Sequence, residues 1–264
     1  MADVTLAIGD VVMPKVATQL IVFGDDAKKN LEATLAAVAE AGYDGAETGL
    51  MLDDVPPKRL ARALELAGLG LAGCHTGFPT LARSAAALEY VAEAGGKHLI
   101  CSGVGGKGKL EFYEQACSVF NQVGELARQK GLVFCYHNHS WEFEDFGGKT
   151  GFDILCQGTD PGLVKLCIDT FWVADAGLDP AVFLYHQRKR AGLVHLKDGR
   201  PKQRLADGSL TFLELGAGDL DFPAILKMTA LAPLEWLTVE QDRSTLPPAE
   251  SIRRSRQYLR DLGV

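Results

Sequence analysis

The sequence predicts an α/β protein with one domain, in which eight parallel strands and their helices close into a (β/α)8 barrel. From about residue 17 onward, short apolar runs alternate with longer segments of helical periodicity. No low-complexity linker or change of composition divides the 264 residues, of which 47% are hydrophobic and 23% charged. Eight strands that are each followed by a helix close more naturally into a barrel than into an open sheet.

Eight runs have the length and composition of buried strands. They cover residues 17–24, 44–48, 71–76, 98–102, 132–139, 163–170, 192–198 and 236–242. Within a single domain of residues 1–264, we expect residues 1–16 to form an N-terminal arm or an extra strand at the bottom of the barrel.

Helices fit between these strands. Residues 26–41 place Leu31, Leu35 and Val38 on one stripe, and Gly42 suits the left-handed position that ends a helix. Proline is favoured in the first turn of a helix, so two proline pairs are expected to begin later helices. They are Pro56–Pro57 and Pro247–Pro248.

Composition disfavours several classes of protein. The N-terminus lacks a basic region followed by a long apolar stretch, and no apolar run approaches a membrane span, so we expect a cytoplasmic protein without a membrane partner. The formal net charge of −7 disfavours nucleic acid as a partner. A homo-oligomer is compatible with the sequence. The six cysteines have no metal-ribbon spacing and are expected to be reduced and buried: Cys74, Cys101, Cys117, Cys135, Cys156 and Cys167.

Polar residues gather where the predicted strands end. In a parallel barrel these positions form the mouth of the active site. Strand alternation places several of them in pairs on shared faces: His137 with His139, Cys167 with Asp169, His195 with Lys197, and Glu240 with Asp242. Burying several carboxylates together is costly unless a cation neutralises them, so the pattern predicts a divalent metal. Asp, Glu and His ligands suit Mn²⁺, Mg²⁺, Co²⁺ or Zn²⁺.

Several segments, in this order and placement, carry a family resemblance. They are residues 19–20 (QL), 41–47 (AGYDGAE), 136–143 (YHNHSWEF), 168–172 (IDTFW), 176–180 (AGLDP), 194–198 (VHLKD), 216–222 (GAGDLDF) and 239–242 (VEQD). From Thr18 onward the chain resembles the xylose-isomerase-like TIM barrel superfamily, especially its sugar phosphate isomerase/epimerase branch. That branch is related to inosose dehydratases, tagatose-type epimerases and 3-keto-glycoside lyases.

The resemblance implies a metal held by residues from strands five to eight. Asp169, His195 and Glu240 match the ligands that the superfamily carries on strands six, seven and eight. On strand five, His137 stands where tagatose-type epimerases carry a ligand Glu, so either His137 or Glu142 is the fourth ligand. We favour Glu142 as the ligand, because this choice keeps the site rich in carboxylates.

The remaining residues at the mouth are assigned to catalysis or substrate binding. We expect His137, His139 and Glu240 to move protons, with Glu142 as a further acid/base candidate. Candidate substrate contacts are Glu47, His75, Asn138, Trp172, Lys197 and Arg200. Glu47 and His75 could instead orient metal ligands, Trp172 could be a packing residue, and Lys197 and Arg200 could bind a phosphate or remain solvated. The glycine-rich segment 103–109 is similar to a Walker A loop, but Leu110 replaces the Ser or Thr that would bind Mg²⁺, so a flexible loop with some phosphate affinity is expected.

These features predict a metal-dependent isomerase or epimerase of a sugar or sugar phosphate. Such an enzyme removes a proton next to a carbonyl and stabilises the resulting enediolate. The resemblance implies a second function, a dehydratase or lyase that acts on an inosose or a keto-sugar by β-elimination. A phosphodiesterase related to endonuclease IV fits less well, because it would need more metal ligands and a DNA-binding face, and a non-catalytic sugar-binding barrel fits least.

Overall fold

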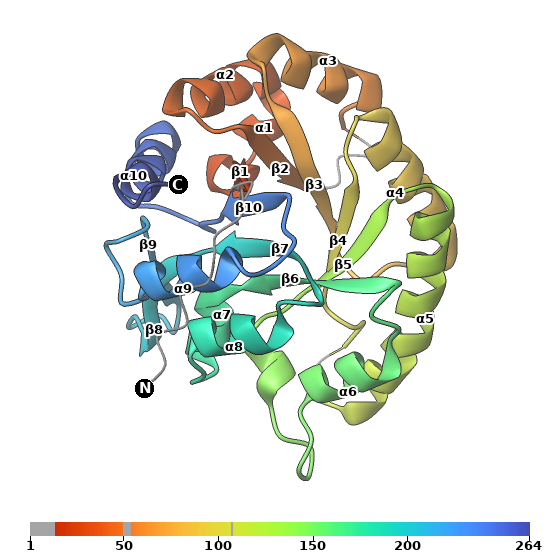
Figure 1. Cartoon of the computed structure of the whole chain (residues 1–264). Helices are drawn as coiled ribbons and strands as arrows, with labels where there is room; N and C mark the ends of the chain where they lie inside the picture. Colours follow the sequence, from red (N-terminus) through yellow and green to blue (C-terminus); the bar gives the residue numbers. More distant parts are fainter. Residues whose placement is uncertain (1–13, 50–53, 107) are drawn as a thin grey trace, which may run out of the picture.

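The computed structural model describes residues 14–49, 54–106 and 108–264, and these form a closed parallel barrel surrounded by helices (Figure 1). The strand order is β1-β10-β7-β6-β5-β4-β3-β2, and β1 closes the barrel by pairing with both β10 and β2. The barrel strands are β1 Lys15–Gln19, β2 Gly45–Gly49, β3 Gly70–Thr76, β4 His98–Ser102, β5 Val133–His137, β6 Val164–Asp169, β7 Ala191–Leu196 and β10 Trp236–Val239. The predicted fold class is confirmed.

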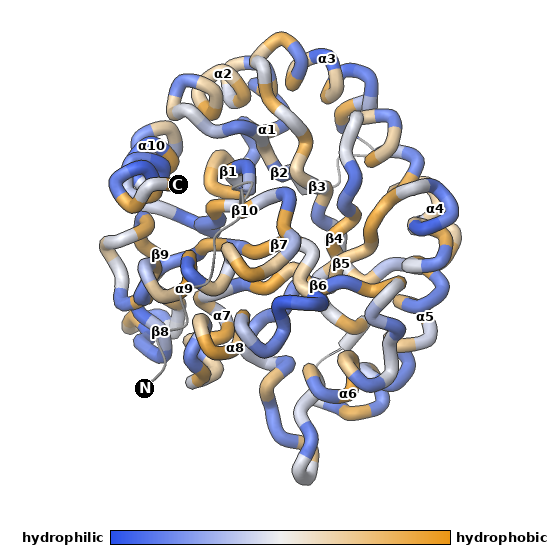
Figure 2. The backbone as a smooth tube through the Cα atoms, viewed as in Figure 1, coloured by the Kyte–Doolittle hydropathy of each residue, from blue (hydrophilic) through white to orange (hydrophobic). Residues whose placement is uncertain are grey.

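Helices connect the strands and form the outer ring. They are α1 Asp26–Lys29, α2 Leu31–Ala41, α3 Pro57–Ala67, α4 Leu81–Glu93, α5 Leu110–Gln129, α6 Gly151–Gly158, α7 Thr170–Asp175, α8 Pro180–Gln187, α9 Phe222–Thr229 and α10 Pro248–Asp261. Two short 3₁₀ helices, η1 Leu20–Phe23 and η2 Trp141–Phe143, follow β1 and β5. In Figure 2 hydrophobic and hydrophilic residues alternate along the outer helices, as expected where one face is buried. Within the described part of the chain, no helix is long and apolar enough to cross a membrane.

A hairpin interrupts the βα pattern after β7. Its strands, β8 Asp198–Arg204 and β9 Leu210–Leu213, form a separate antiparallel sheet (Figure 1). Asp198 anchors the hairpin: its carboxylate accepts hydrogen bonds from the backbone N–H groups of Gly199, Gly216, Gly218 and Leu220, at 2.8 to 3.3 Å. One buried side chain therefore joins both ends of the inserted segment.

Several predicted boundaries differ from the structure. The first strand spans Lys15–Gln19, because η1 begins at Leu20, where the Gln19 side chain accepts a hydrogen bond from the Ile21 N–H. The helix predicted at 26–41 is broken at Asn30, which lies outside helical geometry. The helix starts predicted at the two proline pairs are confirmed in α3 and α10. The left-handed conformation predicted for Gly42 is also confirmed (φ 81°). Residues 1–13 of the predicted arm, and Lys107 of the glycine-rich loop between β4 and α5, lie outside the described residues.

Apolar side chains fill the space inside the barrel below the mouth. This interior cluster consists of Ala17, Ala72, Ile100, Cys135, Cys167, Leu193 and Trp236. A Cβ atom at Gly45 or Gly70 would lie less than 3 Å from the Trp236 ring, so both positions need glycine. A larger cluster packs between the strands and the helices. All six cysteines are free thiols; five are buried, and Cys156 is half-buried.

Candidate active site

Four side chains from four strands meet at the mouth of the barrel. His137 ends β5, Asp169 ends β6, His195 lies on β7, and Glu240 directly follows β10. Their candidate ligand atoms all lie within 4.8 Å of one another, and all four residues are buried. The parallel register produces this meeting, since it pairs Asp169 directly with His195. The three ligands predicted on strands six, seven and eight thus lie together, with His137 as the fourth member.

Three of these residues each keep a buried atom that makes no hydrogen bond within the described part of the chain. The atoms are Asp169 Oδ2, His195 Nδ1 and Glu240 Oε2. His195 Nδ1 and Glu240 Oε2 are in direct contact with each other as an ion pair. Asp169 and His195 are held by their other atom: Asp169 Oδ1 accepts from the Trp172 N–H at 3.0 Å, and His195 Nε2 lies 2.8 Å from Glu47 Oε2. Leaving a buried polar atom unpaired costs about 1 to 3 kcal/mol. The residues present therefore fit a divalent cation, which would bind Asp169 Oδ2 and replace the direct contact between His195 Nδ1 and Glu240 Oε2.

Glu47 orients His195 and does not line the mouth. Its carboxylate is fully buried, with Oε2 on His195 and Oε1 3.6 Å from His75 Nδ1. Burial opposes its ionisation, but the two imidazoles outweigh this and hold the pKa of Glu47 below its ordinary range. An ionised carboxylate that accepts from Nε2–H fixes the tautomer in which Nδ1 is free to bind a metal. Glu47 therefore fits the expected alternative of a residue that positions a ligand.

A β-bulge turns His75 toward the same group. Leu71 packs on the outer side of the barrel and Ala72 on the inside, so simple alternation would turn residue 75 outward. The register between β2 and β3 shifts by one residue after Ala46, which restores an inward direction. The His75 ring lies 5.0 Å from the His137 ring, and its Nε2 is 3.0 Å from Ser102 Oγ.

The structure does not bring Glu142 into the group of four, contrary to our preferred assignment. Glu142 Oε1 accepts a hydrogen bond from the Tyr136 hydroxyl at 2.6 Å, and Oε2 accepts from the His139 N–H at 2.7 Å. Tyr136 alternates with His137 along β5 and belongs to the cluster outside the barrel. The 3₁₀ turn η2 carries Glu142 back toward that outer side. Of the two alternatives on strand five, the geometry supports His137.

Burial sets the protonation of two of the four residues. It lowers the pKa of His137 well below the ordinary range, so the ring is neutral and has a lone pair for a metal. Burial also raises the pKa of Asp169 to about 7, although Lys197 acts in the opposite direction. Lys197 and the His195 ring outweigh burial at Glu240 and hold its pKa well below the ordinary range.

Lys197 is a buried cation and not a solvated rim residue. Its Nζ lies 2.7 Å from Asp242 Oδ2, 3.3 Å from Glu240 Oε1 and 3.8 Å from Asp169 Oδ2. The ammonium also sits about 5 Å from the ring centres of Trp172 and Phe212. Lys197 therefore offsets part of the carboxylate charge. Arg200, by contrast, is exposed on the hairpin, away from the group of four.

Aromatic residues form one wall beside the group. The His139 ring stacks on Trp141 at 3.9 Å and lies 4.9 Å from His137 and 5.1 Å from Trp172. Asn138, an expected substrate contact, exchanges side-chain hydrogen bonds with the backbone N–H and C=O of Asp169. Tyr136, Ser102 and Phe212 also contact this group or its neighbours, and the sequence pattern predicted no role for them. Tyr136 could have been identified, since alternation puts it on the face opposite His137.

The fold and this site define a known class of barrel. The chain belongs to the xylose isomerase-like TIM barrel family, whose model matches residues 35–262.

Similar proteins agree with this class. An inosose dehydratase of Clostridium botulinum is 30% identical over 278 residues, covering 90% of this chain and 91% of that protein. The structure of a sugar phosphate isomerase/epimerase from Parabacteroides distasonis aligns with a TM-score of 0.80 at 20% identity, over 93% of this chain and 97% of that one. The structure of the IolI protein with a bound zinc atom aligns with a TM-score of 0.72 at 17% identity, over 94% of this chain and 97% of that one. The chain is accordingly an enzyme of this family.

Proposed function

We propose that the enzyme binds a divalent metal through His137, Asp169, His195 and Glu240 and removes a proton next to the carbonyl of a sugar or similar polyol ketone. The observation that carries the proposal is the meeting of four buried side chains whose candidate ligand atoms all lie within 4.8 Å of one another. When bound, the metal would polarise the carbonyl and stabilise the negative charge that develops on the substrate oxygens. Two imidazoles with two carboxylates suit Mn²⁺, Co²⁺ or Zn²⁺ better than Mg²⁺, which prefers oxygen ligands.

His139 and His75 are our candidates for moving the proton. His139 lies just beyond β5 and His75 lies on β3, and each ring is about 5 Å from the His137 ring. His137 itself is assigned to the metal, so the acid/base role expected for it passes to these neighbours. Two imidazoles that can take and return a proton fit an isomerase or epimerase. Trp172 and Trp141 supply an apolar surface for the C–H face of the substrate.

A dehydratase is the second candidate. The same first step, followed by loss of a hydroxyl β to the carbonyl, removes water from an inosose or a keto-sugar. The observation that favours it is the 30% identity to an inosose dehydratase over 90% of this chain. The two candidates share the metal ligands and the base, and they differ in where the electron pair of the broken C–H bond goes.

An exchange experiment tests the reaction. The Mn²⁺-loaded enzyme is incubated in D₂O with ketoses, inososes and 3-keto glycosides, and products are followed by NMR. Deuterium next to the carbonyl together with a sugar isomer supports isomerisation or epimerisation. An unsaturated product from an inosose or keto-sugar assigns the dehydratase. If the metal is bound and no compound exchanges or reacts, the proposed chemistry is wrong.

Two variants on and after strand five test the ligand set. His137→Ala should weaken Mn²⁺ binding by about 10- to 100-fold or more, because it removes a ligand. Glu142→Gln should keep the metal affinity and lower the free energy of unfolding by about 1 to 3 kcal/mol, since it disturbs a buried hydrogen-bond pair. Isothermal titration with Mn²⁺ and urea unfolding measure the two effects. The opposite pattern of metal affinities would return Glu142 to the ligand set.

A further inference from the structure

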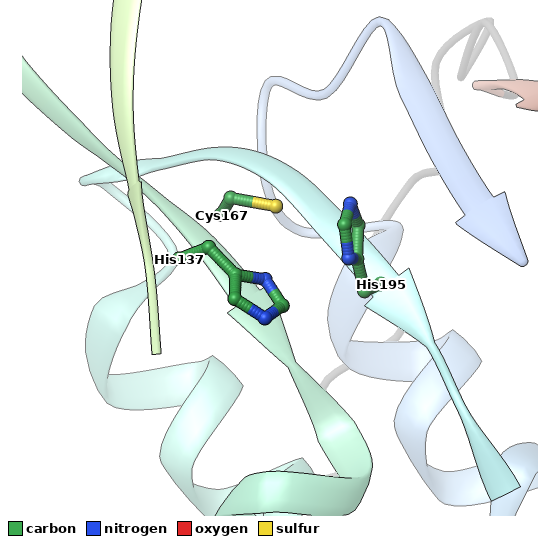
Figure 3. A group of neighbouring side chains, drawn as sticks. All are labelled: His137, Cys167 and His195. Carbon is green, nitrogen blue, oxygen red and sulfur yellow. The ribbon is translucent and has the colours of Figure 1, made fainter. Parts of the chain in front are cut away.

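A thiol lies directly beneath the four proposed ligands. Cys167 precedes Asp169 by two residues on β6, faces the same side of the strand, and is paired in register with His137. It is completely buried, at the top of the interior cluster. Figure 3 shows the Cys167 sulfur and the rings of His137 and His195 turned into one space. One ligand atom from each of the three lies within 4.8 Å of the others.

Two donor sets therefore overlap at the mouth. His137 and His195 belong to both; Asp169 and Glu240 complete the upper set, and Cys167 completes the lower one. Among the described residues, His137 Nδ1 is buried and makes no hydrogen bond, so this nitrogen is available to an ion. His195 Nδ1 contacts Glu240 Oε2, and an ion in the lower set would replace that contact. Carboxylates favour harder cations, whereas a sulfur with two imidazoles favours Zn²⁺, Cd²⁺ and similar ions.

We propose that His137, Cys167 and His195 form a second, deeper site for a thiophilic divalent cation, which excludes the catalytic metal because it takes both histidines. The site goes beyond the proposed function and depends on it only through these shared residues. Binding forms a metal–sulfur bond and breaks the S–H bond of Cys167, whose proton goes to solvent. The expected consequence is inhibition of the Mn²⁺ enzyme by Cd²⁺ or by excess Zn²⁺.

Cys135 provides a matched control. It lies on the neighbouring strand β5, two residues before His137, and is completely buried in the same interior cluster. Cys135 belongs to neither donor set. Replacing it by serine makes the same chemical change in the same layer of the barrel without removing a proposed ligand.

The first test uses Cd²⁺ alone as the probe. Titration of the metal-free protein should produce an ultraviolet thiolate-to-cadmium charge-transfer band that saturates at one Cd²⁺ per chain. Cys167→Ser should abolish the band and Cys135→Ser should keep it, with thermal melts as a check of folding and Cys167→Ala as a second variant. Absence of the band in the wild type, its survival in Cys167→Ala, or its loss in Cys135→Ser would overturn the proposal.

Reciprocal variants then separate the two sites. Asp169→Asn should keep the Cd²⁺ band while Mn²⁺ affinity falls by about 10- to 100-fold, and Cys167→Ser should lose the band while Mn²⁺ affinity stays within about twofold. If Cys167→Ser loses both ions, there is one site and the inference is wrong. If Asp169→Asn keeps its Mn²⁺ affinity, the proposed catalytic ligand set fails, and the cadmium site still stands.

Discussion

The two ends of the barrel interior are built in opposite ways. At the bottom, Trp236 packs against Gly45 and Gly70 so closely that neither position has room for a Cβ atom. At the mouth, Asp169, His195 and Glu240 keep buried atoms without hydrogen bonds. One end is thus packed for stability, and the other gathers buried charged groups at a cost to stability. Substitutions at the bottom should therefore change the free energy of unfolding, whereas substitutions at the mouth should change metal affinity and reaction rate.

The largest effect is expected at the mouth, from Glu240→Gln. Loss of this ligand should lower kcat/KM by on the order of 1,000-fold, about 4 kcal/mol, because charge stabilisation by the metal is lost. Metal content and steady-state kinetics measure the outcome. Asp242→Asn is the control: Asp242 contacts Lys197 at 2.7 Å but lies outside the group of four, so this variant should keep its metal. Full rate and full metal content in Glu240→Gln would show that the mouth does not bind the metal through this residue.

An intermediate effect is expected at the bottom, from Gly45→Ala. The added Cβ would lie 2.7 Å from the Trp236 ring and 2.6 Å from the Gly70 carbonyl oxygen. Overpacking of this kind lowers the free energy of unfolding by about 1 to 3 kcal/mol, measured by urea unfolding, and metal affinity should be unchanged. In Gly49→Ala, on the same strand, the added Cβ meets no atom of the described residues within 4 Å, so stability should change by less than about 0.5 kcal/mol. Equal stability of the two variants would contradict this packing.

The smallest effect is expected at His98, which begins β4. Its Nδ1 lies 2.9 Å from the Ala72 carbonyl oxygen, and burial lowers its pKa below the ordinary 6.5. Below about pH 6.5 the unfolded chain binds a proton that the folded chain excludes, so this contribution to stability is present above pH 6.5 and is lost as pH falls toward the folded pKa. In His98→Gln, whose amide can still donate to Ala72, the unfolding free energy should decline less between pH 7 and 5. An unchanged pH profile would refute this assignment.

Much of the fold was predictable, because each barrel strand is a short apolar run with a turn signal at its end. The ends of the strands and helices were less predictable. Gln19 looks like part of a strand, yet its side chain caps the 3₁₀ turn η1 and ends β1 there. Asn30 likewise breaks an otherwise regular helical stripe, since its backbone leaves helical geometry.

The site was predictable where it depends on strand order alone. Asp169, His195 and Glu240 meet because parallel strands end at one edge. Local chain reversals were not predictable: the turn η2 carries Glu142 away from the mouth, and a bulge in β3 brings His75 toward it. Both depend on a shift of one or two residues that an alternating pattern does not encode.

The anchoring of the hairpin by Asp198 makes that segment an exchangeable module. One carboxylate holds the backbone of Gly199, Gly216, Gly218 and Leu220, so the two ends of the insertion are joined at a single side chain. The segment is also held to the barrel at Asp175, which accepts hydrogen bonds from the Lys202 N–H and the Arg204 guanidinium. We therefore expect length and composition to vary most at the exposed tip, residues 205–208. Phe212 of this segment contacts Trp172 and Lys197 at the mouth. Exchanging the hairpin would therefore change the side chains beside the site and leave the ligand-bearing strands as they are. The barrel thus offers a route by which substrate range can diverge without a new scaffold.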